Sequence, residues 1–291
     1  MTVTSPFTAQ STALEVVAGY DLSGQTALIT GASSGLGSET ARALISAGAT
    51  VILAVRDLSR GEALARTLRA SHPGGQVHLL ELDLASLTSV QRAAKQVLDR
   101  WTHLEILINN AGVMATPSGR TRDGFETQFG TNHLGHALLT MLLLPALRAA
   151  APARVVVLSS SGHWRSDVQF DDLHYAVRPY DKWTAYGQSK TANALFAVGF
   201  TSRFAQDGLT ANALHPGGIH TGLQQHVSAD EWRALGWIDD QGKANPLFKT
   251  VEQGAATSVW AAVGRELDGL GGLYLENCQE ALPADPARPG V

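Results

Sequence analysis

Cysteine and positive charge are both scarce in this sequence. The single cysteine, Cys278, excludes an internal disulfide framework and the usual cysteine-rich zinc sites. The chain carries 22 Lys and Arg against 26 Asp and Glu, which gives a net charge of −4. Without a basic excess, the protein lacks the electrostatic footprint of a phosphate-backbone partner, so we expect no nucleic-acid binding.

Long hydrophobic runs are missing as well. The longest apolar stretch, residues 137–147, contains Thr140 and Pro145 and is much shorter than the roughly 20 residues of a membrane helix. Residues 1–10 lack the basic flank and the apolar run of a signal peptide. We therefore expect no membrane contact and a cytoplasmic location.

Ten histidines are present, but their spacing does not indicate a metal site. His133 and His136 lie three positions apart, and no carboxylate or cysteine completes a familiar set of ligands around them. We expect no metal.

From residue 25 onward, short β-branched runs alternate with longer helical patterns. The predicted strands cover residues 26–30, 50–55, 76–82, 104–108, 154–158, 209–214 and 271–275. The predicted helices cover residues 36–47, 59–71, 87–101, 122–149, 184–206 and 251–263. Residues 155–158 are apolar on both faces, which is typical of a parallel sheet covered on both sides. We predict an α/β, single-domain Rossmann fold, a doubly wound parallel sheet of about seven strands with helices on both faces.

The chain divides most simply into a lead-in, residues 1–24, and one domain, residues 25–285. Residues 161–185 are rich in aromatic side chains, and we interpret them as an insertion beside the pocket. Residues 218–250 are interpreted as a substrate lid. Its Trp232 and Trp237 either pack within the lid or line an apolar substrate pocket.

A glycine-rich turn joins the first strand to the first helix of the domain. A strand, such a turn and a helix N-terminus together form an anion site, because free N–H groups and the helix dipole favour a pyrophosphate. Gly31 can adopt a positive φ for the turn, Gly35 lets a phosphate approach, and Gly37 lets helix and strand pack closely. The alternative is an ordinary turn in a chain with 29 glycines. Residues 109–112 end the fourth strand, which we expect beside the first, where strand order reverses.

Tyr186 and Lys190 are four positions apart in a predicted helix and therefore share one face. A tyrosine titrates near pH 10, and a neighbouring ammonium lowers its pKa, so the pair forms an acid/base unit unless the spacing is a coincidence. Ser160 follows the fifth strand at the same sheet edge, where its hydroxyl can donate to a carbonyl. Asn132 lies inside the long helix, and Pro216 follows the sixth strand.

In this order, the motifs resemble the classical short-chain dehydrogenase/reductase superfamily over about residues 20–280. The matching elements are TGxxxGxG at 31–37, NNAG at 109–112, Asn132, Ser160, YxxxK at 186–190 and PG at 216–217. Arg56, the gap between Ser160 and Tyr186, and residues 250–256 and 272–278 resemble the retinol-dehydrogenase and WW-oxidoreductase-like branch. Two features depart from the pattern. Ser38 stands where the branch often has a basic residue, and the Ser160–Tyr186 spacing is about twice the classical one.

The resemblance implies roles for individual residues. Tyr186 is the catalytic acid/base, Lys190 lowers its pKa and holds the nicotinamide ribose, Ser160 orients the carbonyl, and Asn132 anchors a proton-relay water. The implied cofactor-binding residues are Gly31, Ser33, Ser34, Gly35, Leu36, Gly37, Arg56, Asp83, Leu84, Asn110, Ala111, Gly112, Tyr186, Lys190, Pro216, Gly217, Ile219 and Thr221.

We therefore expect an NADP(H)-dependent oxidoreductase that interconverts a ketone or aldehyde and the corresponding alcohol, acting on a small, apolar or aromatic substrate. A nucleotide-binding sensor or scaffold with little turnover is the alternative, and a homodimer or homotetramer stays open. Arg56 ends the second strand and can accommodate a 2′-phosphate, while Val55 occupies the position of the acidic residue in NAD users. Asp57 is expected to cap the next helix with Ser59. NADP(H) is thus preferred, with NAD(H) as the other option.

Overall fold

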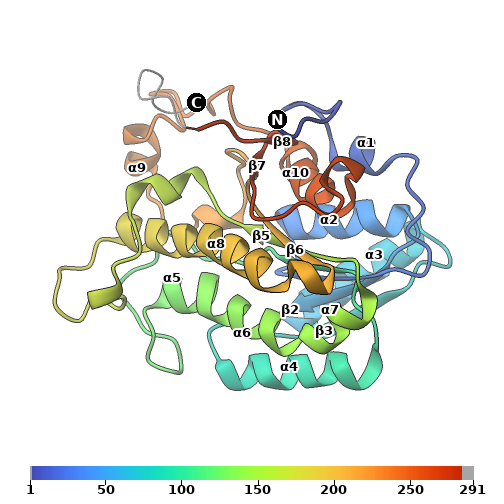
Figure 1. The fold of residues 1–291 in the computed structure, drawn as a ribbon. Helices are drawn as coiled ribbons and strands as arrows, with labels where there is room; N and C mark the ends of the chain where they lie inside the picture. Colours follow the sequence, from blue (N-terminus) through green and yellow to red (C-terminus); the bar gives the residue numbers. More distant parts are fainter. Residues whose placement is uncertain (1, 284–291) are drawn as a thin grey trace.

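A single eight-stranded sheet forms the centre of the protein in the computed structural model, which describes residues 2–283. The strand order is β3-β2-β1-β4-β5-β6-β7-β8 (Figure 1). The strands are β1 (Thr26–Thr30), β2 (Thr50–Val55), β3 (Val77–Glu81), β4 (Ile106–Asn109), β5 (Ala153–Leu158), β6 (Leu209–His215), β7 (Tyr274–Glu276) and β8 (Gln279–Glu280). Strand β1 pairs in parallel with both β2 and β4, so the strand order reverses beside it, as predicted.

The sequence predicts about seven parallel strands, and the structure adds an eighth, β8, which is antiparallel. It pairs antiparallel with β7 through a tight turn in which Asn277 and Cys278 have φ values of 53° and 57°. Positive φ at both central residues is the geometry of a type I′ hairpin, which usually contains Asn-Gly. Because a cysteine occupies the second position, the sequence gives no hairpin signal there. Residues 284 and 285 of the expected domain lie outside the described residues.

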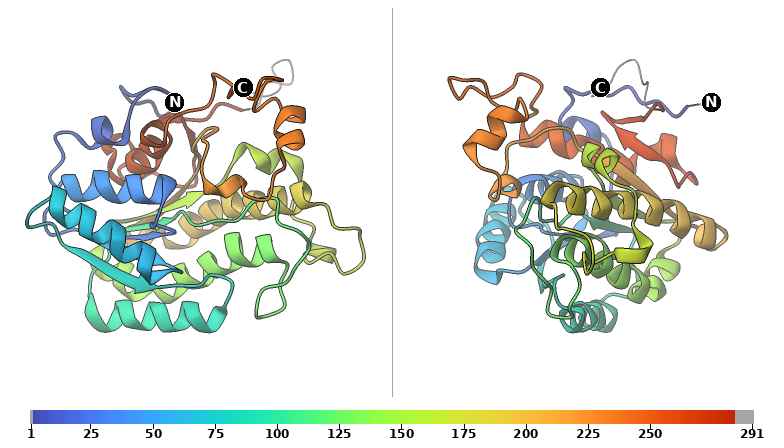
Figure 2. Two further views of the ribbon diagram at one scale, coloured as in Figure 1. Left: turned by 180° about the vertical axis from the view of Figure 1, so that it is seen from behind. Right: turned by 90° about the vertical axis from the view of Figure 1, so that its left-hand side faces the viewer.

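Helices cover both faces of the sheet. On one face lie α1 (Ala13–Val17), α2 (Gly35–Ser46), α3 (Leu58–Ser71) and α10 (Val251–Val263). On the other lie α4 (Leu87–Arg100), α6 (Gly135–Leu142), α7 (Leu144–Ala150) and α8 (Lys182–Phe204) (Figures 1 and 2). Adjacent strand residues serve opposite faces: Ile29 packs in the first core cluster and Leu28 in the second. This alternation explains why the strands are apolar throughout.

The long helix predicted over 122–149 is wrong as one element. The segment starts later, at α5 (Thr127–Phe129), because Glu126 accepts from the amides of Gln128 and Phe129 as its N-cap. A π-helical turn, Gly130–Leu134, leads into α6. Pro145 cannot continue that helix and instead begins α7, so the two parts meet at 58°.

Within the described chain, no single helix has the length and apolarity needed to cross a membrane. The bent pair Thr127–Leu142 and Leu144–Ala150 meets the length and composition requirement. Leu139 and Leu147 of this pair, and Leu143 between its two helices, are fully buried in the protein core.

The N-terminal lead-in is a structured strap along the edge of the sheet. Helix α1 packs against α10 and α2. Upstream of it, the amide of Glu280 donates to the carbonyl of Val3, and the Gln279 side chain donates to the carbonyls of Ser5 and Phe7 and accepts from the Ser5 amide. The strap therefore covers β8, which would otherwise expose its free hydrogen-bonding edge.

We predict that Gln279→Ala lowers the free energy of unfolding by about 1–3 kcal/mol, because it leaves several strap backbone groups without partners. Urea unfolding followed by circular dichroism measures the change. Gln241→Ala is the control, since Gln241 is exposed on the lid. Equal stability of the two variants would contradict a stabilising strap.

Candidate active site

The hydroxyl of Thr30 joins the predicted motifs at the carboxyl edge of the sheet. Its Oγ1 accepts from the amides of Asn110 and Ala111, at 2.9 and 3.0 Å, and lies 2.8 Å from Nε2 of His136. The Asn110 side chain donates in addition to the Thr30 carbonyl at 2.7 Å. The glycine loop after β1 and the NNAG loop after β4 are therefore held against each other.

His136 continues this network into the next helix. Burial lowers its pKa to about 4, so the ring is neutral at physiological pH. Nδ1 lies 2.8 Å from the carbonyl oxygen of Asn132 and must donate to it, which makes Nε2 the acceptor of the Thr30 hydroxyl proton. Sequence reasoning considered this histidine only as a metal ligand. Among the described residues, no three His, Cys, Asp or Glu side chains are grouped so that they could hold a metal ion.

Asn132 connects this hydrogen-bond network to helix α8, which carries Tyr186 and Lys190. Its amide nitrogen donates to the Val113 carbonyl and to Oγ of Ser189, both at 2.9 Å, and its oxygen accepts from the Val113 amide at 2.8 Å. Ser189 in turn donates to the carbonyl of Tyr186 at 2.7 Å. A continuous chain of buried hydrogen bonds thus runs from Thr30 to the backbone of Tyr186. Because both amide hydrogens of Asn132 are engaged by protein, its role toward a water molecule stays a prediction.

The glycine loop has the shape of an anion cradle. Gly31 and Gly35 have φ values of 65° and 57°, as the tight turn requires. A Cβ on Gly31 would lie 2.8 Å from Cα of Ala111, and one on Gly37 would lie 2.6 Å from the Gly31 carbonyl oxygen. The N-cap Ser34 makes no side-chain hydrogen bond to α2 within the described chain. The amides at the start of α2 therefore remain available for an anion, which fits a dinucleotide pyrophosphate.

Arg56 lies at the end of β2, where two cavities meet. One, of 510 Å³, is lined by Arg56 and Asp83 among other residues, and the second, of 640 Å³, by Arg56, Arg60 and Gln225. Asp57 also lines the second cavity, and its Oδ1 accepts from the amides of Ser59 and Arg60 at 2.9 and 3.2 Å. The expectation that Asp57 caps α3 is confirmed. Leu84, also predicted to bind the cofactor, is buried beside Asp83.

Helix α8 places Tyr186 and Lys190 on one face, both only 4% exposed. The Lys190 ammonium donates to the Leu158 carbonyl at 2.9 Å and lies 5.6 Å from the centre of the Tyr186 ring. The predicted lowering of the tyrosine pKa is not seen. Burial raises the pKa of Tyr186 to about 12, with the Ser160 hydroxyl acting in the opposite direction, and burial lowers the pKa of Lys190 to about 8. Desolvation therefore exceeds the effect expected from the neighbouring ammonium.

The serines after β5 have separate tasks. Ser159 is buried and donates to the Lys190 carbonyl at 2.8 Å, so its hydroxyl holds the loop to α8. Ser160 Oγ accepts from the Gly162 amide at 3.0 Å, which leaves its proton available for a further acceptor. A Cβ on Gly162 would lie 2.8 Å from Cε1 of Tyr186. Gly162 thus permits Ser160 and Tyr186 to lie together, a requirement that the sequence analysis missed.

The segment after β6 returns to the glycine loop. Gly217 has a φ of 103°, and a Cβ there would lie 2.9 Å from Cδ of Lys249. Ile219 is buried, and Thr221 caps a short 3₁₀ turn, Gly222–Gln224. A Cβ on Gly35 would lie 3.5 Å from the Thr221 methyl group. Thr221 therefore lies against the glycine loop, while the cofactor-binding roles of Pro216, Gly217, Ile219 and Thr221 stay predictions.

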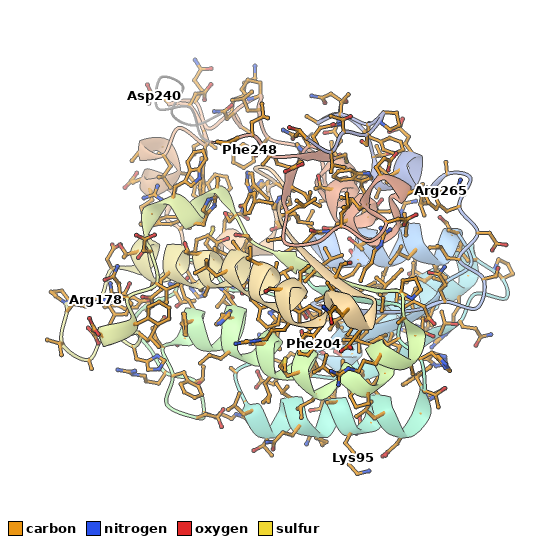
Figure 3. The ribbon with its side chains drawn as sticks, in the orientation of Figure 1. Lys95, Arg178, Phe204, Asp240, Phe248 and Arg265 are labelled. Atoms are coloured by element: carbon orange, nitrogen blue, oxygen red, sulfur yellow. The ribbon has the colours of Figure 1, made fainter. Side chains whose placement is uncertain are left out.

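An apolar, largely aromatic cluster surrounds Tyr186. It includes Met114, Trp183 and the lid residues Trp232, Trp237 and Phe248. The ring centres of Trp232 and Trp237 are 5.2 Å apart, and those of Trp183 and Trp237 are 5.9 Å apart. The lid, which contains α9 (Ala229–Ala234), projects from one corner of the molecule (Figure 2, right). Figure 3 shows Asp240 at the outer side of the lid and Phe248 nearer to the sheet. The two lid tryptophans thus share one apolar cluster with Tyr186.

The insertion over 161–185 is anchored beside the same cluster. The side-chain amide of Gln128 donates to the hydroxyl of Tyr180 at 3.0 Å and to the carbonyl of Lys182 at 2.8 Å. Arg178, at the side of the molecule in Figure 3, lies over the ring of Tyr175 at 3.8 Å. These contacts hold the insertion between α5 and the start of α8.

The fold and this arrangement of residues are those of a nicotinamide-dependent dehydrogenase, and the comparison with known proteins agrees. The short chain dehydrogenase family matches residues 25–232, so the chain belongs to this family and is an NAD(P)-dependent dehydrogenase/reductase. It is 49% identical over 265 residues to a Streptomyces lividans protein named "Probable oxidoreductase", covering 90% of this chain and 87% of that one. Human retinol dehydrogenase 13 is 41% identical over 273 residues, covering 91% of this chain and 80% of that one.

A solved structure gives the same fold. A crystal structure from Beutenbergia cavernae, assigned as an NAD(P)-dependent gluconate 5-dehydrogenase with bound NADP, is 25% identical with a TM-score of 0.69. The match covers 88% of this chain and 95% of that one. The retinol dehydrogenases among the relatives place this chain in the retinol-dehydrogenase-like branch of the family.

The buried Lys190 predicts a pH dependence of stability. An unfolded lysine keeps its proton up to its ordinary pKa of 10.5, whereas the pKa of folded Lys190 is about 8. Between these pH values the unfolded chain binds more protons, so the unfolding free energy rises with pH on this account. We predict that the wild type gains stability relative to Lys190→Met from pH 8 to 10.5, measured by urea unfolding. Parallel stability curves would show that Lys190 is not desolvated.

Proposed function

We propose that this protein is a carbonyl reductase that uses NADPH to convert an apolar ketone or aldehyde into the corresponding alcohol. The observation that carries the proposal is the close packing of Ser160 and Gly162 against Tyr186, which itself belongs to an apolar cluster. The hydroxyls of Ser160 and Tyr186 adjoin one another there, and the site is shielded from water.

The chemistry follows from the protonation of these groups. The Ser160 oxygen accepts from the Gly162 amide, and the hydroxyl still has its own proton to donate to the carbonyl oxygen of the substrate. Since the pKa of Tyr186 is about 12, the phenol is protonated at neutral pH and donates its proton to the oxygen as negative charge develops there. When bound, the reduced cofactor supplies the hydride. A protonated tyrosine can therefore act as the acid of carbonyl reduction near neutral pH.

Lys190 and the glycine loop are assigned to the cofactor. The Lys190 ammonium is held by the Leu158 carbonyl on the side of α8 that faces Gly112: a Cβ on that glycine would lie 3.7 Å from Nζ. From there it can donate to ribose hydroxyls. The uncapped start of α2 and the glycines at 31, 35 and 37 accept the pyrophosphate.

The choice of NADPH rests on the charges at the end of β2. Arg56 and Arg60 both line the 640 Å³ cavity together with Asp57 and Glu81, and a guanidinium group can bind a phosphate through charge-assisted hydrogen bonds. Asp57, the residue that could bind a ribose hydroxyl and repel a phosphate, uses its Oδ1 for the cap of α3. NAD(H) is the alternative cofactor, with Asp57 as the ribose ligand.

A sensor or scaffold on the same fold is the alternative function. Such a protein needs the nucleotide-binding loop but has no use for a serine and a tyrosine that adjoin next to an apolar cluster. The lid tryptophans support a substrate with an apolar or aromatic body, because they belong to the same cluster as Tyr186. Oxidation of NADPH in the presence of aryl ketones, aliphatic aldehydes, retinoids and steroids separates the two functions.

We predict that Tyr186→Phe loses about 10²–10⁴-fold in kcat while its affinity for NADPH is unchanged, because only the acid proton is removed. Steady-state NADPH oxidation and titration of cofactor fluorescence measure the two quantities. Tyr20→Phe, in the N-terminal strap, is the control. Turnover by Tyr186→Phe at the rate of the control would exclude Tyr186 as the acid.

We predict that Arg56→Ala raises the KM for NADPH about tenfold or more and leaves the KM for NADH nearly unchanged, because a charge-assisted bond to the 2′-phosphate is lost. Kinetics with both cofactors measure the effect, and Arg66→Ala, exposed on α3, serves as the control. Equal use of NADH and NADPH by the wild type would contradict the assignment.

A further inference from the structure

A second tyrosine lies behind the catalytic serine. Tyr274 is the first residue of β7, and it is far from Ser160 in the sequence. Its hydroxyl donates to the backbone carbonyl of Ser160 at 3.0 Å. Burial raises the pKa of Tyr274 well above its ordinary value, so this donor keeps its proton at neutral pH.

His163 donates to the same carbonyl oxygen. Its Nδ1 lies 2.6 Å from the Ser160 oxygen, and because a carbonyl only accepts, Nδ1 carries the proton. The rings of His163 and Tyr274 are in contact, with centres 4.9 Å apart, and Nδ1 lies 3.1 Å from the tyrosine hydroxyl. The Ser160 carbonyl therefore accepts from two donors, Tyr274 and His163, whose rings also pack against each other.

The two donors bind the chain at the start of a 3₁₀ turn. Ser160 is the N-cap of the 3₁₀ turn Ser161–Arg165, and its Oγ accepts from the amide of Gly162 within that turn. The same turn presses the backbone of Gly162 against the Tyr186 ring. Fixing the Ser160 carbonyl fixes the plane of the following peptide and hence the direction in which the Ser160 hydroxyl points.

We infer that Tyr274 is a positioning residue for Ser160, holding the serine hydroxyl toward the substrate carbonyl oxygen without touching the substrate itself. The inference rests on the proposed function only for the part of Ser160 in turnover; the hydrogen bond from Tyr274 stands apart from it. The residue responsible thus comes from the edge of the sheet, beyond the lid in the sequence.

The test is a double-mutant cycle of Tyr274→Phe and Ser160→Ala, assayed by NADPH oxidation with an aryl ketone. Tyr274→Phe should lower kcat about 3- to 10-fold in the wild type, with an unchanged KM for NADPH, as expected for one lost hydrogen bond. In the Ser160→Ala background it should have no further effect, because no hydroxyl remains to be aimed. An equal loss of kcat in both backgrounds would overturn the inference.

Tyr180→Phe is the matched control for a general loss of stability. The Tyr180 hydroxyl donates to the Thr116 carbonyl and accepts from the Gln128 side chain, both at 3.0 Å, and neither of these partners is Ser160. Whatever its effect on kcat, it should be the same in both backgrounds, and an effect that disappears with Ser160→Ala would overturn the specific role of Tyr274.

Amide hydrogen exchange tests the same contact without turnover. Tyr274→Phe should speed exchange of the Gly162 amide about tenfold while leaving the amides of β5 unchanged. Unchanged exchange at Gly162 would overturn the inference even in an active enzyme. Accelerated exchange in a protein that reduces no carbonyl would support the positioning contact and refute the proposed function instead.

Discussion

The hydroxyl of Thr30 is the contact on which the site depends. It lies between two loops that belong to different strands, and the buried His136 extends its influence through Asn132 and Ser189 to the backbone of Tyr186. Each group in this chain is buried, so each hydrogen bond left unmade would cost free energy. The nucleotide groove and the catalytic helix are therefore not independent features of the sheet edge. They are two ends of one polar network inside an apolar core.

The sequence alone predicts the parts of the molecule whose signals are local. Strands that are apolar on both faces, glycines at a strand–helix junction and a Tyr–Lys pair on one helix face all act over a few residues. The sheet and its reversal beside β1 followed from these patterns, as did the capping role of Asp57. Each is governed by propensity, periodicity or backbone sterics, and such terms can be read directly from neighbouring residues.

The parts that escaped prediction depend on residues distant in sequence. Gly162 is required because the Tyr186 ring lies above it, and His136 gains its role from Thr30, which is far away along the chain. The pKa of Tyr186 was misjudged for a related reason. Spacing reveals the ammonium of Lys190 but not the depth at which both groups are buried, and here desolvation is the larger effect. The break between α6 and α7 was missed for a different reason: the apolar pattern continues across Pro145 and predicts one uninterrupted helix.

The pairing of Val3 with Glu280 has a consequence for how the protein is made. Figure 1 shows the N-terminal strap and β8 on the same side of the molecule. During synthesis the nucleotide-binding strands leave the ribosome before β7, the strand that carries Tyr274. A nascent chain can therefore assemble its cofactor groove before its catalytic loop acquires the contact from β7. The N-terminal strap, although it is made first, must wait for the β7–β8 hairpin before it can dock on β8.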